Sequence, residues 1–489
     1  MVINSFVFFL FFVVVFLGYY LPPLSSRVGW QNCWLLLASY LFYSFADPMM
    51  LLLLVGATVI LFFLGIWIGK LLDQGQGRVA SSVTALGVCL GIGILLYFKY
   101  LGFFADSLAG LLRLAGFQAS WTTLHIVLPV GVSFFTFKLI SYIVEIRCRR
   151  IRPCTNLVDF SLYISFFPTI MSGPIDRPNT FLPQLREIRR FDYPLAVDGC
   201  RQILWGMFIK MCIADNLAEL VDEAWADISG QSASALVLAA LLYTVQIYTD
   251  FDGYSHMAIG IGKVLGLHIT RNFNHPFIAR STAEVWRRWH MSLMNWFRDY
   301  VYIPLGGSRC ARSKVILNTL IVFALSGLWH GADWSFVFWG LYHGCLVSAY
   351  ILLGIKTKKD MAYVGQKLPT GVQFGQMVLT FGLMTLGWIF FRAPSIDDGW
   401  NYVMSVLSGQ NGFRLGHMGM MIASRVDVIL FVMLLLLVEW VKRNAEHPLQ
   451  FGSRLLLKNS FARYAIYYLL AFLIVCYQGG GNTFIYFQF

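Results

Sequence analysis

Charged residues are scarce in this chain, where they make up 13% of 489 residues against 58% that are hydrophobic. A soluble globular domain carries about 25% charged residues, so about half of the usual solubilising charge is missing. The mean hydropathy is correspondingly high, at +0.65. This composition excludes an ordinary soluble domain and indicates a membrane protein.

The apolar residues stand in blocks near 20 residues long, which matches the thickness of a bilayer core. The clear blocks are Ser5–Leu21, Met49–Gly69, Val83–Leu101, Ser335–Gly354, Phe374–Phe391 and Val426–Trp440. In lipid only helices and closed β-barrels pair all backbone N–H and C=O groups. The blocks lack the apolar-polar alternation of barrel strands, which leaves helices. The sequence therefore predicts an all-α polytopic membrane protein, with eleven to twelve transmembrane helices in one domain over residues 1–489.

Several local motifs are also missing. The nine cysteines form no CxxC pair and mostly lie inside apolar blocks, so neither a disulfide framework nor a metal site is predicted. The chain has no HExxH, GxSxG or Walker A sequence, which excludes common soluble-enzyme sites. The first apolar block has no basic residue before it and no small-residue cleavage site after it, so we expect a transmembrane helix rather than a signal peptide.

The net charge of +12 comes from basic residues that fall between the apolar blocks. This distribution indicates positive-inside topology rather than nucleic-acid binding. The basic loops at 147–152 and 356–359, and the residues after Trp440, are therefore predicted to be cytoplasmic. The acidic stretch Glu219–Asp227 contains no basic residue and is predicted to lie outside, as are both termini.

Two stretches do not read as ordinary spans. Residues 161–178 are apolar but contain Pro168, Gly173, Pro174 and Pro178, and proline disrupts a helix. Such backbone is tolerated at membrane depth only against protein or water, which predicts a re-entrant segment. Residues 271–314 carry eight basic against two acidic residues, so this stretch is predicted to lie on the cytoplasmic side.

Residues 284–300 read EVWRRWHMSLMNWFRDY. On a helix of 100° per residue the aromatic side chains share one face, while Arg287 and Arg288 lie on the opposite face. This pattern predicts an interfacial amphipathic helix. His290 falls at the aromatic edge, where it is either a catalytic candidate or an ordinary interface residue.

Residues 325–344 read LSGLWHGADWSFVFWGLYHG. His330 stands between two apolar runs, and an ionisable residue at such a position suggests function. Histidine is also the natural general base near neutral pH. The structural alternative is a capping turn, in which Gly331 ends one helix and Asp333 caps the next.

Asp250, Asp252 and His256 interrupt the apolar stretch at residues 234–262. The carboxylates are candidates for lining a polar cavity. Alternatively, they pair with arginines of a neighbouring helix.

The blocks 286–309, WRRWHMSLMNWFRDYVYIPLGGSR, and 327–344, GLWHGADWSFVFWGLYHG, resemble the membrane-bound O-acyltransferase (MBOAT) family in its AlgI/DltB branch. The block at 327–344 is similar to the one that holds the family's near-invariant histidine. Blocks at 133–146, 166–178, 206–218, 248–266 and 484–489 also match in order. The ending FIYFQF and the length favour the alginate-acetylation type. Ser255-His256 departs from the family pattern of a small residue and aspartate, which puts the role of His256 in doubt.

The resemblance implies an enzyme of the bacterial inner (cytoplasmic) membrane that moves an acyl group, expected to be acetyl, from cytoplasmic acetyl-CoA to an outside hydroxyl. It implies a polysaccharide acceptor, an extracytoplasmic SGNH-type partner and no permanently bound cofactor. His330 would be the general base, and His290 would assist from the cytoplasmic side. Combined with the topology, this predicts that the two histidines serve opposite ends of one tunnel. Other tunnel candidates are Trp329, Trp334, Asp250, Asp252, Arg287 and Arg288, with the two indoles as possible oxyanion donors.

Two other classes of function remain open. A polytopic transporter or lipid flippase would explain the spans and the buried carboxylates, and a non-catalytic subunit of a polysaccharide export complex would also be membrane-embedded. Neither accounts well for two histidines in tryptophan-rich blocks. The acceptor is also open among alginate, cellulose, peptidoglycan, another exopolysaccharide and a small extracellular molecule.

Overall fold

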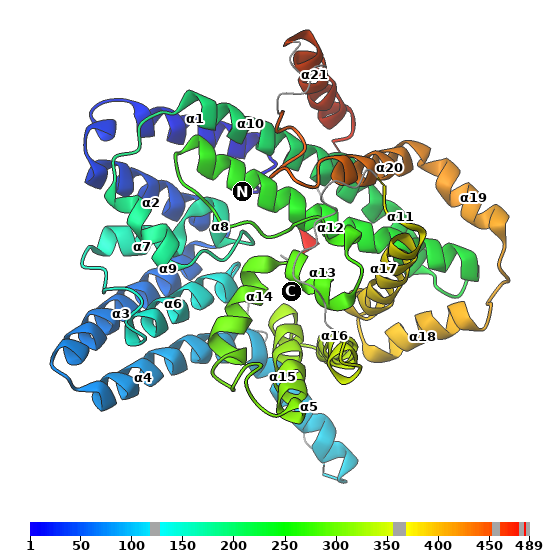
Figure 1. The fold of residues 1–489 in the computed structure, drawn as a ribbon, viewed down its shortest axis with the longest axis horizontal. Coiled ribbons are helices and arrows are strands. Elements are labelled where there is room, and N and C mark those ends of the chain that lie inside the picture. Colours follow the sequence, from blue (N-terminus) through cyan, green and yellow to red (C-terminus); the bar gives the residue numbers. More distant parts are fainter. Residues whose placement is uncertain (118–127, 356–367, 452–459, 479–483, 486–489) are drawn as a thin grey trace. The chain divides into compact units, whose positions relative to one another are not determined.

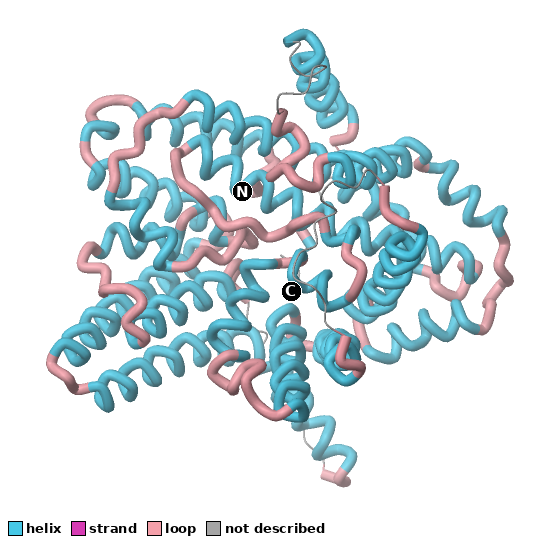
Figure 2. Tube along the Cα trace, viewed as in Figure 1, coloured by secondary structure: helices cyan, strands magenta, loops and turns pink. Residues whose placement is uncertain are grey.

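The computed structural model describes residues 1–117, 128–355, 368–451, 460–478 and 484–485. The predicted cytoplasmic loop at 356–359 and the end of the FIYFQF block lie outside these residues. Within the described ranges every regular element is helical (Figure 2). The predicted all-α class is therefore confirmed.

Six helical stretches of the described chain are long and apolar enough to cross a membrane: Pro48–Asp73, Gly77–Leu114, Ala233–Val264, Arg312–His330, Trp334–Leu352 and Gly371–Arg392. A seventh would be the pair α19 (Leu415–Ser424) and α20 (Val426–Val441), which bends by 87°. The helices α1 (Phe6–Tyr20) and α21 (Ser460–Cys476) are apolar but shorter. A polytopic membrane protein is confirmed, while the count of eleven to twelve crossings stays a prediction.

The contacts within the chain define two compact units. The first comprises residues 1–199 and 258–270, and the second comprises residues 200–257 and 271–489. The helices α10 (Tyr193–Phe208) and α12 (Ala233–Val264) contribute residues to both units. That the whole chain forms one membrane domain stays a prediction.

The first unit is built on packed long helices. Its elements are α1, α2 (Val28–Ser44), α3 (Pro48–Asp73), α4 (Gly77–Leu95), α5 (Leu101–Leu114), α6 (Val132–Arg147), α7 (Leu157–Ser165), α8 (Phe167–Ile170) and α9 (Pro178–Phe181). A π-helical turn, Leu96–Tyr100, joins α4 to α5. The helices α3, α4 and α6 pack side by side (Figure 1), and α2 packs on α7. Asp47 starts α3 by accepting hydrogen bonds from Met49 N and Met50 N, as an N-cap residue does.

The segment 161–178 is broken, as predicted. The helix α7 ends at Ser165, and Pro168 stands in the first turn of α8, where its missing N–H is not needed. The buried Lys138 of α6 donates to Thr169 Oγ1 at 2.9 Å, which satisfies polar groups of the break inside the protein. Re-entry of this segment into a membrane stays a prediction.

The second unit contains the two histidine blocks. Its elements after α12 are α13 (Thr282–Arg288), α14 (Met291–Phe297), α15 (Arg312–His330), α16 (Trp334–Leu352), α17 (Gly371–Arg392), α18 (Ile396–Leu407), α19, α20 and α21. Before them, a π-helical turn at Ile209–Ala214 joins α10 to α11 (Asp215–Ala226).

The prediction of one continuous helix over 284–300 is wrong. The structure has two helices of seven residues each, α13 and α14, and the chain turns at Trp289 and His290 between them. Trp286 and Trp289 are buried, because the aromatic face packs on other helices of the same unit. Periodicity could not reveal the break, since neither glycine nor proline marks it.

The helices α15 and α16 form a hairpin whose backbones touch at two glycines. A Cβ added to Gly327 would lie 2.1 Å from the carbonyl oxygen of Phe336, and one added to Gly340 would lie 2.2 Å from that of Phe323. Small residues allow such close approach between membrane helices. The glycines recur at four-residue spacing in the GLWHG and GLYHG sequences, a signal of helix pairing that the sequence analysis did not use.

We predict that Gly327→Ala destabilises the protein by about 1–3 kcal/mol, the usual cost of overpacking, because the new methyl group meets backbone that cannot yield. Gly375→Ala in α17 is the matched control, since a Cβ there meets nothing within 4 Å, and alanine favours a helix by about 1 kcal/mol over glycine. The measurement is the thermal unfolding midpoint of each purified protein in detergent. Equal midpoints for the two variants would contradict the close packing of the hairpin.

Candidate functional site

His330 is the last residue of α15, and the turn that follows it is capped. Gly331 has extended backbone, and its N–H donates to the carbonyl of Gly327 at 3.3 Å. Asp333 then caps α16 by accepting from Ser335 N at 2.7 Å. The capping turn weighed as a structural alternative is therefore present.

Capping does not account for the surroundings of the His330 side chain, which is 4% exposed. Its ring centroid lies 5.1 Å from that of Trp339 and 5.2 Å from that of Phe391, both at steep angles. The turn thus directs an ionisable ring into an aromatic part of the second unit. An ionisable side chain buried inside a membrane protein is a functional candidate, which favours a functional reason for histidine at this position.

His290 lies in the break between α13 and α14. Its φ of +43° is left-handed, a conformation that costs a non-glycine residue of order 1 kcal/mol and often marks a functional site. The turn is held because Met291 N donates to Asn272 O at 2.8 Å, while Asn272 also bonds Ser255 and Ser292. The His290 side chain is 1% exposed.

The structure brings the two histidines together. Their ring centroids are 6.4 Å apart, and the buried Trp329 contacts both, at 5.7 Å from His290 and 4.8 Å from His330. A bilayer core is about 30 Å thick, so the prediction that they lie at opposite ends of a tunnel is wrong. The break at His290 turns its ring toward α15, which a continuous helix would not have done. That clefts from the two sides of the membrane meet here stays a prediction.

Aromatic side chains of α16 and α17 form a wall beside His330. Trp339 contacts Trp388 at 5.4 Å and Phe391 at 5.1 Å. The indole N–H of Trp339 is fully buried and has no hydrogen-bond partner among the described residues. An unpaired buried donor costs about 1–3 kcal/mol, so this group is suited to an acceptor atom on a ligand.

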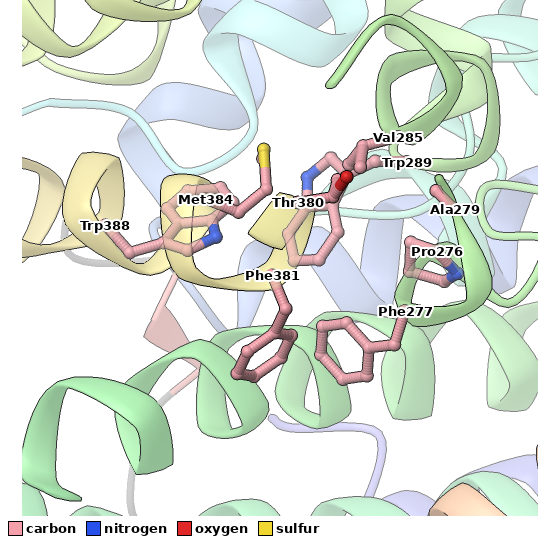
Figure 3. A pocket seen from close by; sticks show the side chains of 9 residues that line it. All are labelled: Pro276, Phe277, Ala279, Val285, Trp289, Thr380, Phe381, Met384 and Trp388. Carbon is pink, nitrogen blue, oxygen red and sulfur yellow. The ribbon is translucent and has the colours of Figure 1, made fainter. Parts of the chain in front are cut away.

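A narrow apolar crevice lies against Trp388 of this wall (Figure 3). Its free volume of about 10 Å³ is the space of one water-sized group. It is lined by Pro276, Phe277, Ala279, Val285, Trp289, Thr380, Phe381, Met384 and Trp388. Neither histidine is among these lining residues.

The predicted indole donors differ in position. Trp329 is buried against both histidine rings. Trp334, at the start of α16, is 54% exposed, and its role in lining a tunnel stays a prediction. As the first residue after the Asp333 cap it faces outward, while Trp339 takes the place beside His330.

Asp250 and Asp252 each contact a nitrogen-bearing side chain within the second unit. Asp250 pairs with Lys210, whose Nζ also lies 2.7 Å from Asp215, and Asp252 lies 3.4 Å from His256 Nε2. The expectation that the carboxylates are paired is correct, but their close partners are a lysine and a histidine rather than arginines. Neighbouring residues of a helix point in different directions, so it is the ring of Phe251 that contacts His290, at 4.7 Å.

Arg287 and Arg288 do not have equivalent surroundings. Arg288 is buried and is held by Glu284 Oε1 at 2.9 Å and by Asn274 O at 3.0 Å. Arg288 therefore fixes α13 to the preceding loop, and its role in a tunnel stays a prediction. Arg287 is half-buried, and its role in a tunnel stays a prediction.

The sequence analysis missed Lys210, Trp339 and Phe391 as members of this region. A signal for Lys210 was present, because a lysine in the apolar run GMFIKMCIA is an ionisable residue at an unfavourable position. Trp339 and Phe391 carried no such signal, since aromatic residues are common in membrane helices.

Burial lowers the pKa of His290 to about 3, so its ring is neutral at physiological pH. In the unfolded chain histidine has a pKa near 6.5, so below that pH the unfolded state binds a proton that the folded state excludes. The contribution of His290 to stability therefore falls as the pH drops from 6.5 toward 3.

We predict that the wild type loses about 2 kcal/mol more stability than His290→Asn when the pH is lowered from 7.5 to 5. This difference arises because 1.5 pH units below 6.5 correspond to that free energy. Asparagine tolerates the left-handed backbone. The measurement is the thermal midpoint of both proteins at the two pH values. Identical pH dependence in wild type and variant would show that His290 is not buried as a neutral ring.

Comparisons with known proteins agree with this arrangement. The model of the membrane-bound O-acyltransferase family matches residues 150–358, a range that includes both histidines. The chain is 38% identical over 410 residues to the probable alginate O-acetylase AlgI of Pseudomonas aeruginosa, covering 83% of this chain and 75% of that protein. It is 32% identical over 441 residues to the peptidoglycan O-acetyltransferase of Helicobacter pylori, covering 84% and 80%.

A more distant similarity extends to the teichoic acid D-alanyltransferase of Bacillus subtilis, at 29% identity over 271 residues, covering 54% of this chain and 68% of that protein. The long matches at more than 30% identity span most of both chains. The resemblance drawn from the two histidine blocks is confirmed, and the chain belongs to the membrane-bound O-acyltransferase family.

Proposed function

We propose that this O-acyltransferase moves an acetyl group from cytoplasmic acetyl-CoA to a hydroxyl of a polysaccharide outside the bacterial inner membrane. The observation that carries the proposal is the pair of buried histidine rings, 6.4 Å apart at their centroids, with Trp329 against both. Two ionisable rings held together in an apolar enclosure fit proton transfer during acyl exchange, and neither rival function needs them.

In the proposed reaction His330 is the general base. As the acceptor hydroxyl attacks the thioester carbonyl, the His330 ring takes the hydroxyl proton and the carbon–oxygen bond forms. When the carbon–sulfur bond breaks, the thiolate leaves and recovers that proton. Exchange of a thioester for an ester needs no ion gradient, so the protein's task is to orient the reactants and stabilise charge.

His290 supports this chemistry as a neutral ring. A second charged imidazolium at this distance would oppose protonation of His330, because like charges disfavour each other. The lowered pKa of His290 removes that repulsion. We therefore assign His290 to orienting a reactant rather than to accepting the proton.

The indole of Trp339 is the better oxyanion donor of those near His330. Its N–H is buried and unpaired within the described part of the chain, whereas Trp334 is largely exposed. A preorganised donor of this kind in a dry site stabilises the developing negative charge on the carbonyl oxygen.

The acyl group and the acceptor class are supported by the relatives. The long matches are to proteins named alginate O-acetylase and peptidoglycan O-acetyltransferase, while the D-alanyltransferase matches over a shorter range at lower identity. These names favour acetyl as the group and a cell-envelope polysaccharide as the acceptor. Delivery through an SGNH-type partner outside the membrane is part of the same proposal, and the positive-inside distribution of basic residues in the sequence supports a cytoplasmic donor side.

We predict that His330→Ala lowers acetyl transfer about 10²–10⁴-fold, the usual contribution of a general base. The assay is the label transferred from radiolabelled acetyl-CoA to polysaccharide by inside-out membrane vesicles. His268→Ala, at an exposed position, is the matched control and should keep wild-type activity. Near-wild-type turnover in correctly inserted His330→Ala would exclude His330 as the base.

The same assay separates the rival functions. A transporter, a flippase or a non-catalytic export subunit gives no labelled polysaccharide even in wild-type vesicles supplied with the partner. Absence of label in that complete system would overturn the proposed function.

We predict that Trp339→Phe, which keeps a large ring but removes the N–H, lowers the acetyl-transfer rate about 10²–10³-fold, as loss of one oxyanion donor does. The KM for acetyl-CoA should change little, because the interaction forms in the transition state. Trp400→Phe, at an exposed position in α18, is the control. A change confined to KM would mean that the indole only binds substrate.

A further inference from the structure

The first unit contains a wide hollow. It lies between the last two turns of α3 and the loop that follows α6, and its volume is about 730 Å³. The wall contributed by α3 includes Ile66, Gly69, Lys70 and Asp73. The opposite wall is formed by residues 146, 149–153 and 155. This volume is far larger than a water molecule needs and lies in the range of small-molecule sites.

The rim of the hollow is strongly basic. Lys70, Arg149, Arg150 and Arg152 line it against the single acidic residue Asp73. Arg150 is neutralised in part by Glu145, at 3.1 Å. Arg149 donates to the carbonyl of Leu72 at 2.8 Å. Because a carbonyl is neutral, this hydrogen bond does not cancel the positive charge of Arg149. Within the described ranges no acidic side chain pairs with Lys70 or Arg152, so the hollow carries a net positive charge.

The walls of the hollow are held in place by the fold. Arg149 has left-handed backbone, with φ of +55°, and its guanidinium bonds the end of α3. Gly69 allows Pro153 to pack directly on α3, because a Cβ there would lie 2.3 Å from the proline ring. Cys154 N donates to the hydroxyl of Tyr142 at 2.9 Å. The basic groups are therefore presented by a fixed loop.

An apolar surface of α3 leads into the hollow. Phe63 and Trp67 precede Lys70 by seven and three residues, so the three side chains share one side of the helix. Phe63 is 59% exposed and Trp67 is 49% exposed. Exposed aromatic residues next to a basic cluster are typical of a helix end at the membrane interface. The surroundings thus combine cationic groups with a flank suited to acyl chains.

We propose that this hollow binds a phosphate ester, presented by the head group of an anionic phospholipid whose chains lie along Phe63 and Trp67. Basic pockets between membrane helices bind such head groups through charge and hydrogen bonds. The volume exceeds that of a bare phosphate ion and leaves room for the rest of a head group. A soluble phosphate ester has the same charged chemistry but makes no use of the apolar flank.

The test uses the full-length protein in nanodiscs of phosphatidylcholine with a minor share of phosphatidylglycerol. The phosphatidylglycerol that stays with the protein is measured by native mass spectrometry after release from the discs. The double variant Lys70→Ala/Arg152→Ala should retain it about thirty-fold more weakly, since each basic group near an anionic surface contributes about a fivefold factor. Arg78→Ala, on α4 and outside the lining, is the control and should behave as wild type.

Competition with adenosine 3′,5′-bisphosphate separates the two sources of phosphate. Failure of this soluble compound to displace phosphatidylglycerol supports a lipid site. Displacement that disappears in the double variant keeps the phosphate site but overturns the lipid assignment. Equal retention by wild type and double variant, or equal loss in Arg78→Ala, overturns the site itself. None of these outcomes depends on acyl transfer.

Discussion

The backbone contact between α15 and α16 is the packing on which the histidine site depends. At Gly327 and Gly340 the two helices approach so closely that no side chain fits between them. The turn that joins them must then be short and capped, as it is by Gly331 and Asp333. His330 stands at the start of this turn, so close packing of the hairpin fixes the direction of its ring.

The second requirement is that buried polar groups find partners inside the protein. Lys210 forms ion pairs with Asp215 and Asp250 in the second unit. Lys138 donates a hydrogen bond to Thr169 in the first unit. A charge buried alone would cost several kcal/mol. These pairs hold the irregular segments, the π-helical turn at Ile209–Ala214 and the break at residue 166, where helical hydrogen bonds are interrupted.

Several of the neighbours of the two histidines are aromatic rings. Phe251, Trp329, Trp339 and Phe391 surround the pair, and such surroundings exclude water. Apolar surroundings strengthen electrostatic interactions with a reacting group, which suits an O-acyltransferase.

The sequence by itself determined the helical membrane class, the position of the long helices, the broken segment at 161–178 and the two histidine blocks. Each is encoded locally, by run length, by proline or by a rare ionisable residue among apolar ones. Only the tertiary structure decided that α13 and α14 are separate, that Trp339 rather than Trp334 lies beside His330, and that His290 and His330 meet. These outcomes depend on contacts between residues distant along the chain. The physical reason is that periodicity records which face of a helix is apolar, whereas packing decides which apolar partner covers it and where the backbone must turn.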